Sequence, residues 1–221
     1  MGNTAYTVAS VQVAQARKVV IDGRSILTAI HKTAVQGPVA VQPLGLQGDE
    51  QADLSVHGGL EKAVYAYPAE HYAFWQEARQ RAGVAGIDTA LPHGSMGENL
   101  TLSGLLETDV VVGDVLRFPH CVLRVAQPRE PCYKFNAAMG FNTAVKAMAQ
   151  SGFCGFYLSV DAPGTVQAGE AFELLPGPRH VSIPQRFVAK SGPRNRVGKI
   201  FVDYLRNGRG ATTVSAWSAR A

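Results

Sequence analysis

The sequence predicts a mainly β domain, a β-rich α+β fold in which short, mostly antiparallel strands curl into a barrel with a few helices outside it. Short runs rich in β-branched and aromatic residues recur throughout the first 176 residues. Turn-forming pairs such as Asp22-Gly23 and Gly113-Asp114 separate neighbouring runs. Because only two stretches of this region show helical spacing, we expect strands to form most of the core.

Apolar periodicity and its interruptions give the expected elements. A helix is expected at 68–81, with a proline in its first turn and Gly83 just past its end. A second helix is expected at 143–151, capped by Asn142 and stopped by Gly152. Strands are expected at residues 6–13, 18–21, 24–27, 39–41, 62–67, 98–102, 110–112, 115–118, 121–126, 153–160, 165–167 and 171–175.

Length and charge divide the chain into a main domain and a tail. The 221 residues are 46% hydrophobic, which is enough for one substantial core. We expect a barrel domain at 1–176 and a basic C-terminal extension at 177–221 that is partly helical or disordered. Lys and Arg number 12 against 16 Asp and Glu in the domain, but 9 against 1 in the extension. This asymmetry fits a tail docked on its own domain, and the absence of aromatic clusters does not favour nucleic acid as a partner.

Targeting and redox features point to one compartment. The first ten residues lack the basic start and apolar run of a signal peptide, and no window has the roughly eighteen apolar residues that span a bilayer. We therefore expect a cytoplasmic protein without membrane contact. Cys121, Cys132 and Cys154 show no CxxC spacing, which argues against a disulfide framework or a Cys-based zinc site. Because Cys121 and Cys154 have apolar neighbours, we expect both to be buried with raised pKa values.

A proline-rich loop around Cys132 is the candidate functional centre. Pro128 and Pro131 restrict the backbone, so the loop can hold the thiol in one orientation. Arg129 and Lys134 flank the thiol, and nearby cations favour the thiolate, which binds soft metals or attacks electrophiles. An isolated intracellular cysteine is also commonly an inert apolar residue, so the loop alone leaves both interpretations open.

Further motifs accompany this loop. The first joins residues 45–49 (GLQGD) to residues 57–59 (HGG). The second is the segment at 97–100 (GENL), and the third joins residues 155–160 to residues 162–164. Together with the cysteine loop they resemble the MOSC family, named after the C-terminal domain of molybdenum cofactor sulfurase. Within it the chain is most similar to the stand-alone bacterial YiiM type, associated with resistance to N-hydroxylated purines. The resemblance covers residues 11 to 176 approximately, so the main domain is expected to be a MOSC-like β-barrel.

This resemblance implies that the protein binds the molybdenum cofactor, with Cys132 as metal ligand and catalytic residue. His57 is a second catalytic candidate, as a hydrogen-bond partner or proton relay, although a structural role is equally open. Lys62 is read either as a phosphate contact or as a solvated strand end, and Glu98 either contacts the cofactor or only pairs with Arg129. The candidate cofactor-binding residues are Arg129, Lys134, Lys62, Gly58, Gly59, Asn99, Glu98, Gln127 and Asp49.

The expected activity is reduction of N-hydroxylated bases of the 6-N-hydroxylaminopurine type, with a non-catalytic cofactor or sulfur carrier as the alternative. The sequence has no GxGxxG motif, P-loop or iron–sulfur cysteine set, so we expect no NAD, ATP or iron–sulfur site. Pyridoxal phosphate is not expected either. Electrons are therefore expected from an external electron-transfer flavoprotein. The loop at 45–59, the segment at 97–100 and the cysteine loop are expected to converge on one cleft, while the oligomeric state stays open.

Overall fold

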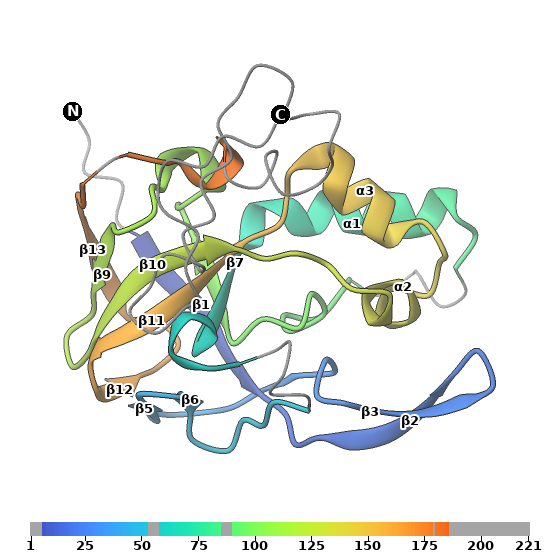
Figure 1. Cartoon of the computed structure of the whole chain (residues 1–221), viewed down its shortest axis with the longest axis horizontal. Helices are drawn as coiled ribbons and strands as arrows, with labels where there is room; N and C mark the ends of the chain where they lie inside the picture. Colours follow the sequence, from blue (N-terminus) through green and yellow to red (C-terminus); the bar gives the residue numbers. More distant parts are fainter. Residues whose placement is uncertain (1–5, 53–57, 85–89, 179, 186–221) are drawn as a thin grey trace, which may run out of the picture.

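The computed structural model describes residues 6–52, 58–84, 90–178 and 180–185. Its centre is a closed barrel of seven strands in the order β13, β9, β10, β11, β7, β8 and β1, with β13 pairing back to β1 (Figure 1). These strands are β1 (Tyr6–Val13), β7 (Val64–Pro68), β8 (Leu100–Ser103), β9 (Val115–Arg117), β10 (Val122–Pro128), β11 (Phe156–Ala162) and β13 (Ala171–Leu175). All neighbours are antiparallel except β7 and β8. The predicted mainly β, mostly antiparallel barrel is confirmed.

The parallel pair β7 and β8 requires a crossover connection, and the first helix supplies it. A 3₁₀ turn, η2 (Ala69–His71), leads into α1 (Tyr72–Arg81), so the helix expected at 68–81 begins with a tighter turn. Trp75 on α1 is fully buried, and its indole ring packs edge-on against the ring of Phe135 at 5.2 Å between centroids. Burial of such large rings anchors the helix beside the barrel, where Figure 1 shows it.

Two shorter helices follow the cysteine loop. The first, α2 (Lys134–Met139), was not expected, because six residues are too few to show a helical period. The second, α3 (Ala144–Ser151), ends at Gly152 as predicted, with φ of 75°. The cap expected from Asn142 is wrong: the N-cap is Thr143, and the first-turn amide of Val145 donates instead to Oδ1 of Asn136 at 2.8 Å. Thus α2 supplies the capping group for α3.

Smaller sheets lie against the barrel. The hairpin β2 (Arg17–Ile21) and β3 (Arg24–Thr28) has the predicted turn, with φ of 50° at Asp22 and 73° at Gly23. It projects beyond the barrel at the lower right of Figure 1. A second sheet joins β12 (Gly164–Val166), β5 (Val39–Gln42) and β6 (Gly45–Leu46), and the short β4 (Thr33–Ala34) pairs with β1. The remaining 3₁₀ turns are η1 (Leu60–Lys62) and η3 (Glu107–Asp109).

The start of the C-terminal extension packs on the barrel. The strand expected at 110–112 is only a bridge between Val111 and Ser182. Backbone hydrogen bonds from Val112 to Val181 and from Ile183 to Val110 hold the extension there, and Ile183 is fully buried. The domain boundary expected at residue 176 stays a prediction, because this contact continues the core a few residues further.

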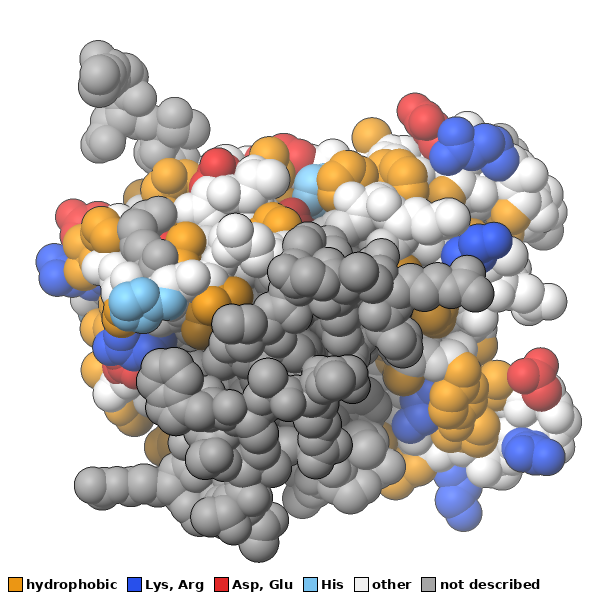
Figure 2. Space-filling view, turned by 45° about the horizontal axis from the view of Figure 1, so that its top comes forward, with side chains coloured by type: hydrophobic (Ala, Val, Ile, Leu, Met, Phe, Trp, Pro, Cys, Tyr) orange, Lys and Arg blue, Asp and Glu red, His pale blue; other side chains and the backbone are white. Residues whose placement is uncertain are grey.

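The described surface carries both signs of charge. On the face shown in Figure 2, Lys and Arg side chains are interspersed with Asp and Glu rather than gathered into one patch. Among the residues that the structure describes, no helix is long and apolar enough to cross a bilayer.

Candidate functional site

A pocket lies where the predicted motifs meet. Among the residues that the structure describes, its wall includes Asp49 and Gly58 from the loop after β6, Gly97 and Asn99 from the turn before β8, and Cys132. The predicted convergence is therefore confirmed for these positions, whereas His57 lies outside the described residues. The other charged and aromatic lining residues are Lys32, Glu50, Lys62, Tyr65, Arg129, Glu130, Lys134 and Tyr157.

Cys132 is held between the end of β10 and the start of α2. Its thiol is half-buried and belongs to the pocket wall. Its backbone carbonyl accepts a hydrogen bond from the amide of Phe135 at 2.9 Å, so the cysteine begins the first turn of α2. On the other side, the amide of Arg129 donates to the carbonyl of Gly155 at 3.4 Å. The loop is thus anchored on both sides of the thiol, as the two prolines suggested.

Arg129 is a buried cation in the pocket wall. Only 6% of the residue is exposed, and its guanidinium carbon lies 5.1 Å from the ring centroid of Tyr65 and 4.8 Å from that of Phe135. Burial alone would lower the pKa of Arg129, but the nearby Tyr65, Tyr157 and Cys132 groups outweigh this effect and raise its pKa. No described carboxylate forms an ion pair with it. A buried charge of this kind favours an anion in the pocket.

Two lysines and one glycine line the pocket together with Arg129. Lys134 Nζ donates to the carbonyl of Leu27 at 3.0 Å, which ties α2 to the β2–β3 hairpin. Lys62 Nζ lies 6.0 Å from the ring centroid of Tyr157. Gly58 lines the pocket with φ of 92°, a conformation that favours glycine and brings backbone close to a ligand. The adjacent Gly59 is exposed and caps η1 instead of lining the pocket.

Lys32, which no sequence pattern indicated, forms a buried ion pair with Asp49 inside the pocket. Their side chains are only 8% and 4% exposed. Asp49 also accepts hydrogen bonds from the amide of Ala14 and from Nδ2 of Asn99, both at 2.8 Å. Burial lowers the pKa of Lys32, while Asp49 and Glu98 act in the opposite direction. A single lysine between His31 and Thr33 carries no periodic signal, so only the tertiary contact reveals it.

Asn99 is a pocket residue with a structural task. Its Oδ1 accepts the amide of Tyr65 at 3.1 Å, and its Nδ2 donates to Asp49 and to the carbonyl of Gln12. Both amide hydrogens therefore have protein partners. This leaves little donor capacity for the cofactor contact that is predicted for this side chain.

Glu98 and Gln127 require correction. Glu98 is fully buried outside the pocket wall and does not pair with Arg129. Gln127 is also buried, and its Nε2 donates to the carbonyl of Glu61 at 3.4 Å. Neither residue lines the pocket. The carboxylate of Glu98 instead stabilises the turn before β8, which contributes Gly97 and Asn99 to the pocket wall. Its oxygens accept hydrogen bonds from Tyr72 Oη, Gly94 N, Met96 N and Thr101 Oγ1.

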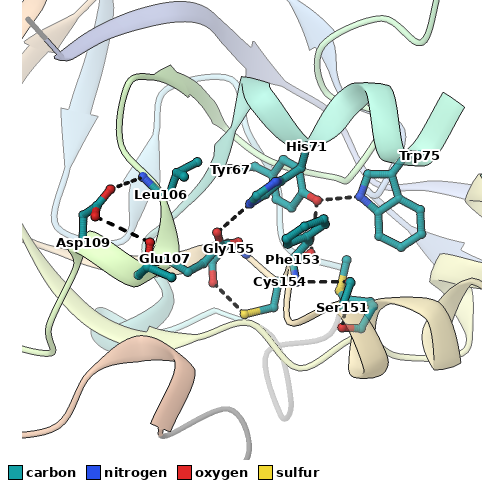
Figure 3. A network of polar contacts seen from close by, with 12 residues as sticks. Tyr67, His71, Trp75, Leu106, Glu107, Asp109, Ser151, Phe153, Cys154 and Gly155 are labelled. Atoms are coloured by element: carbon teal, nitrogen blue, oxygen red, sulfur yellow. Dashed lines mark hydrogen bonds and ion pairs between the residues drawn. The ribbon is translucent and has the colours of Figure 1, made fainter. Parts of the chain in front are cut away.

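A second polar network holds the chain at Gly155 (Figure 3). Glu107 accepts the amide of Gly155 at 2.7 Å with one oxygen, and His71 Nε2 lies 2.7 Å from the other. The imidazole of His71 stacks on the ring of Phe153 at 3.7 Å between centroids. Because Gly155 also accepts the amide of Arg129, this network fixes the chain that supports the pocket.

The other two thiols behave as predicted. Cys121 and Cys154 are both buried in the core. Burial raises the pKa of Cys121 to about 12, and burial also raises the pKa of Cys154. Neither thiol lines the pocket.

Gly94 allows the turn before β8 to approach the backbone of Lys32. It has φ of 94°, and an added Cβ would lie 2.7 Å from the carbonyl oxygen of Lys32. We expect Gly94→Ala to lower the free energy of unfolding by about 2–4 kcal/mol, because it combines left-handed strain with a backbone clash. Gly83→Ala is the matched control, since its φ is 69° with open space around the added carbon, and it should cost about 1 kcal/mol. Equal losses for both variants in urea unfolding would contradict this close approach.

With this geometry established, comparisons with known proteins identify the family. The MOSC domain model matches residues 53–173, which is more than half of the chain. The chain belongs to the MOSC family. It is 40% identical to the uncharacterized protein YflK of Bacillus subtilis over 170 residues, covering 77% of this chain and 73% of YflK. It is also 40% identical to YiiM of Escherichia coli over 148 residues, covering 67% of this chain and 64% of YiiM.

A crystal structure and a named enzyme extend the MOSC comparison. YiiM from Geobacillus stearothermophilus superposes with a TM-score of 0.67 at 32% identity, covering 86% of this chain and 85% of that chain. A protein named "Reductase" from Gibberella moniliformis is 34% identical over 157 residues. That match covers 71% of this chain but 27% of the fungal protein, so the chain corresponds to a part of it.

A second comparison concerns the C-terminal side of this MOSC protein. The primase-polymerase domain model of LigD matches residues 139–221. A 39-residue stretch is 77% identical to the multifunctional non-homologous end joining protein LigD of Pseudomonas aeruginosa, covering 18% of this chain and 5% of that protein. The structure places α3, β11, β12 and β13 beside or within the barrel, so these elements belong to the MOSC fold. The match beyond residue 185 lies outside the described residues.

The donor set of the MOSC pocket fits a molybdenum cofactor. Among the described residues, no three His, Cys, Asp or Glu side chains gather to hold a metal ion by themselves. The pocket instead offers one soft thiol, Cys132, together with the buried cation of Arg129 and the lysines at 62 and 134. Such a set suits an anionic group that brings most of its own metal ligands and takes one sulfur from the protein.

Proposed function

We propose that this protein binds the molybdenum cofactor in the pocket around Cys132 and reduces N-hydroxylated bases of the 6-N-hydroxylaminopurine type. The observation that carries the proposal is the half-buried thiol of Cys132 in one pocket with the buried guanidinium of Arg129. Membership of the MOSC family and a relative named as a reductase support it.

Each part of the pocket has a separate task in this proposal. Cys132 Sγ would bind the metal, and Arg129 with Lys62 and Lys134 would bind the phosphate and pterin oxygens. When bound, the cofactor supplies the two-electron chemistry. Tyr157 also lines the pocket, and we assign its ring the contact with a planar base. Electrons come from an external donor, for which we propose a flavoprotein.

Arg129→Met tests the anion-binding part of the proposal. The substitution removes the buried charge but keeps apolar volume, so we expect unchanged or slightly higher thermal stability. Molybdenum retained after purification should fall at least about tenfold, since the loss of a charge-assisted contact costs about 1.5–3 kcal/mol. Arg117→Met is the matched control, because Arg117 forms an exposed ion pair with Glu173. Wild-type molybdenum content in Arg129→Met protein would contradict the proposal.

The alternative is a carrier that holds cofactor or a persulfide on Cys132 and transfers it without turnover. An assay with reduced viologen as artificial donor separates the two functions. The reductase proposal expects turnover of a hydroxylaminopurine by cofactor-loaded protein. Stoichiometric molybdenum without any turnover would favour the carrier.

A second candidate function, contact with nucleic acid, is favoured by the match to LigD together with the charge of residues 177–221, 9 Lys and Arg against 1 Asp or Glu. It expects DNA affinity that falls steeply with salt. Deletion of residues 186–221 should abolish that affinity while keeping the packed Ile183. Equal DNA binding by the full chain and the truncated protein would exclude this role for the tail.

A further inference from the structure

The Lys32–Asp49 pair is a buried ion pair in the pocket wall that the proposed cofactor contacts do not use. Lys32 is nearly buried, yet it lines the same pocket as Cys132. Its partner Asp49 is fixed by two further donors, the amide of Ala14 and Nδ2 of Asn99. The pair therefore has a fixed position at the wall of the proposed reaction site.

Stability alone is a weak reason for such a pair. Desolvating two charges costs about as much as their attraction returns, and apolar replacements of buried pairs are often neutral or stabilising. Anion binding is also a weak explanation, because the charge of Lys32 is already compensated by Asp49. Arg129, by contrast, has no ion pair with a described carboxylate.

The proposed reaction needs protons. Reduction of an N-hydroxylamine breaks the N–O bond, takes up two electrons and two protons, and gives the amine and water. The bound cofactor would supply the two electrons, and the external donor would replace them. One proton must reach the departing oxygen, because hydroxide is a poorer leaving group than water, and the other must reach nitrogen.

We propose that Lys32 gives its ammonium proton to the departing hydroxyl oxygen and that Asp49 is its positioning residue, an assignment that rests on the proposed function. Solvent supplies the second proton to nitrogen and later reprotonates the neutral amine of Lys32. Asp49 keeps its hydrogen bonds from Ala14 and Asn99 throughout, so its carboxylate is not left bare when Lys32 is neutral. The negative charge of Asp49 then favours reprotonation of the Lys32 amine.

The surroundings of Lys32 suit a proton donor. Burial lowers its pKa, while Asp49 from the loop after β6 and Glu98 from the turn before β8 oppose this effect. Turnover should therefore fall as pH rises through the pKa of Lys32, because the donor is then neutral. The other charged groups that line the pocket are Glu50, Lys62, Arg129, Glu130 and Lys134.

Lys32→Arg separates proton donation from charge. Arginine keeps the cation and its contact with Asp49, but its guanidinium does not release a proton near neutrality. We expect wild-type molybdenum content and KM, with kcat reduced roughly 10²- to 10⁴-fold and no alkaline decline attributable to residue 32. Lys146→Arg, on the exposed side of α3, is the control and should match wild type.

A titration of the cofactor-free protein gives an independent measurement. Lysine labelled with ¹³C at Cε is followed by NMR against pH, and Lys32→Arg assigns the signal of Lys32. We expect this signal to titrate below those of the exposed lysines. Titration together with the exposed lysines would overturn the proposal.

The kinetic outcomes are distinguishable. Wild-type turnover by Lys32→Arg, with loss of cofactor in Lys32→Met, would show that Lys32 anchors an anion by its charge. This result would overturn the proposed proton donation but not the proposed reductase function. Cofactor-loaded wild-type protein without turnover would overturn the proposed reductase function and this assignment with it.

Discussion

Replacing Cys132 by serine is expected to abolish molybdenum binding and turnover while leaving thermal unfolding within about 0.5 kcal/mol of wild type. The thiol is half-buried in a loop that is held by backbone hydrogen bonds, so its packing contribution is small. A neutral hydroxyl is a hard, weak donor that cannot replace a thiolate at a soft metal. Molybdenum content, turnover and thermal unfolding should be measured on the same preparations.

The other cysteines provide matched controls. Cys121→Ser and Cys154→Ser place a hydroxyl in the core, which should cost about 1–3 kcal/mol. Since neither residue lines the pocket, molybdenum per folded molecule should stay at the wild-type value. An active, molybdenum-loaded Cys132→Ser protein would show that the chemistry lies elsewhere.

Replacing Glu98 by alanine is expected to give the largest loss of stability, at least about 3 kcal/mol. The carboxylate is completely buried and accepts hydrogen bonds from four donors. Its removal takes away the acceptor that these four donors share, in a place that water does not reach, although Gly94 N also donates to Tyr72 Oη at 3.0 Å. Chemical denaturation followed by tryptophan fluorescence measures the loss, because Trp75 is buried in the core.

Two further variants make this prediction specific. Glu173→Ala removes an acid that is mostly exposed in its ion pair with Arg117 and should cost less than about 0.5 kcal/mol. Glu98→Gln keeps one acceptor oxygen and should fall between wild type and Glu98→Ala. A Glu98→Gln protein with wild-type stability but without molybdenum would restore the cofactor-binding role that the structure argues against.

Local patterns predicted those parts of the fold that local forces determine. The strand Tyr6–Val13 and the hairpin turn at Asp22-Gly23 follow directly from side-chain alternation and turn chemistry. The order of the strands in the barrel could not be predicted in this way, because the pairing of β1 with β13 joins residues from opposite ends of the domain. No short window of sequence contains that information.

The same limit explains the outcome for the site. Cys132 and Gly58 lie in motifs of recognisable composition, and the pocket contains both. Lys32 was missed because its importance comes from an ion pair with Asp49, 17 residues away, inside the folded domain. Glu98 was placed wrongly because a motif indicates which residues are needed, but not whether a side chain faces the ligand or supports the turn behind it.

The most direct test is a crystal structure of the freshly purified protein, with anomalous diffraction recorded on both sides of the molybdenum absorption edge. We predict a molybdenum peak in the pocket, within bonding distance of Cys132 Sγ and beside Arg129. A molybdenum peak remote from Cys132, or cofactor density in the pocket with the thiol turned away from the metal, would contradict this account.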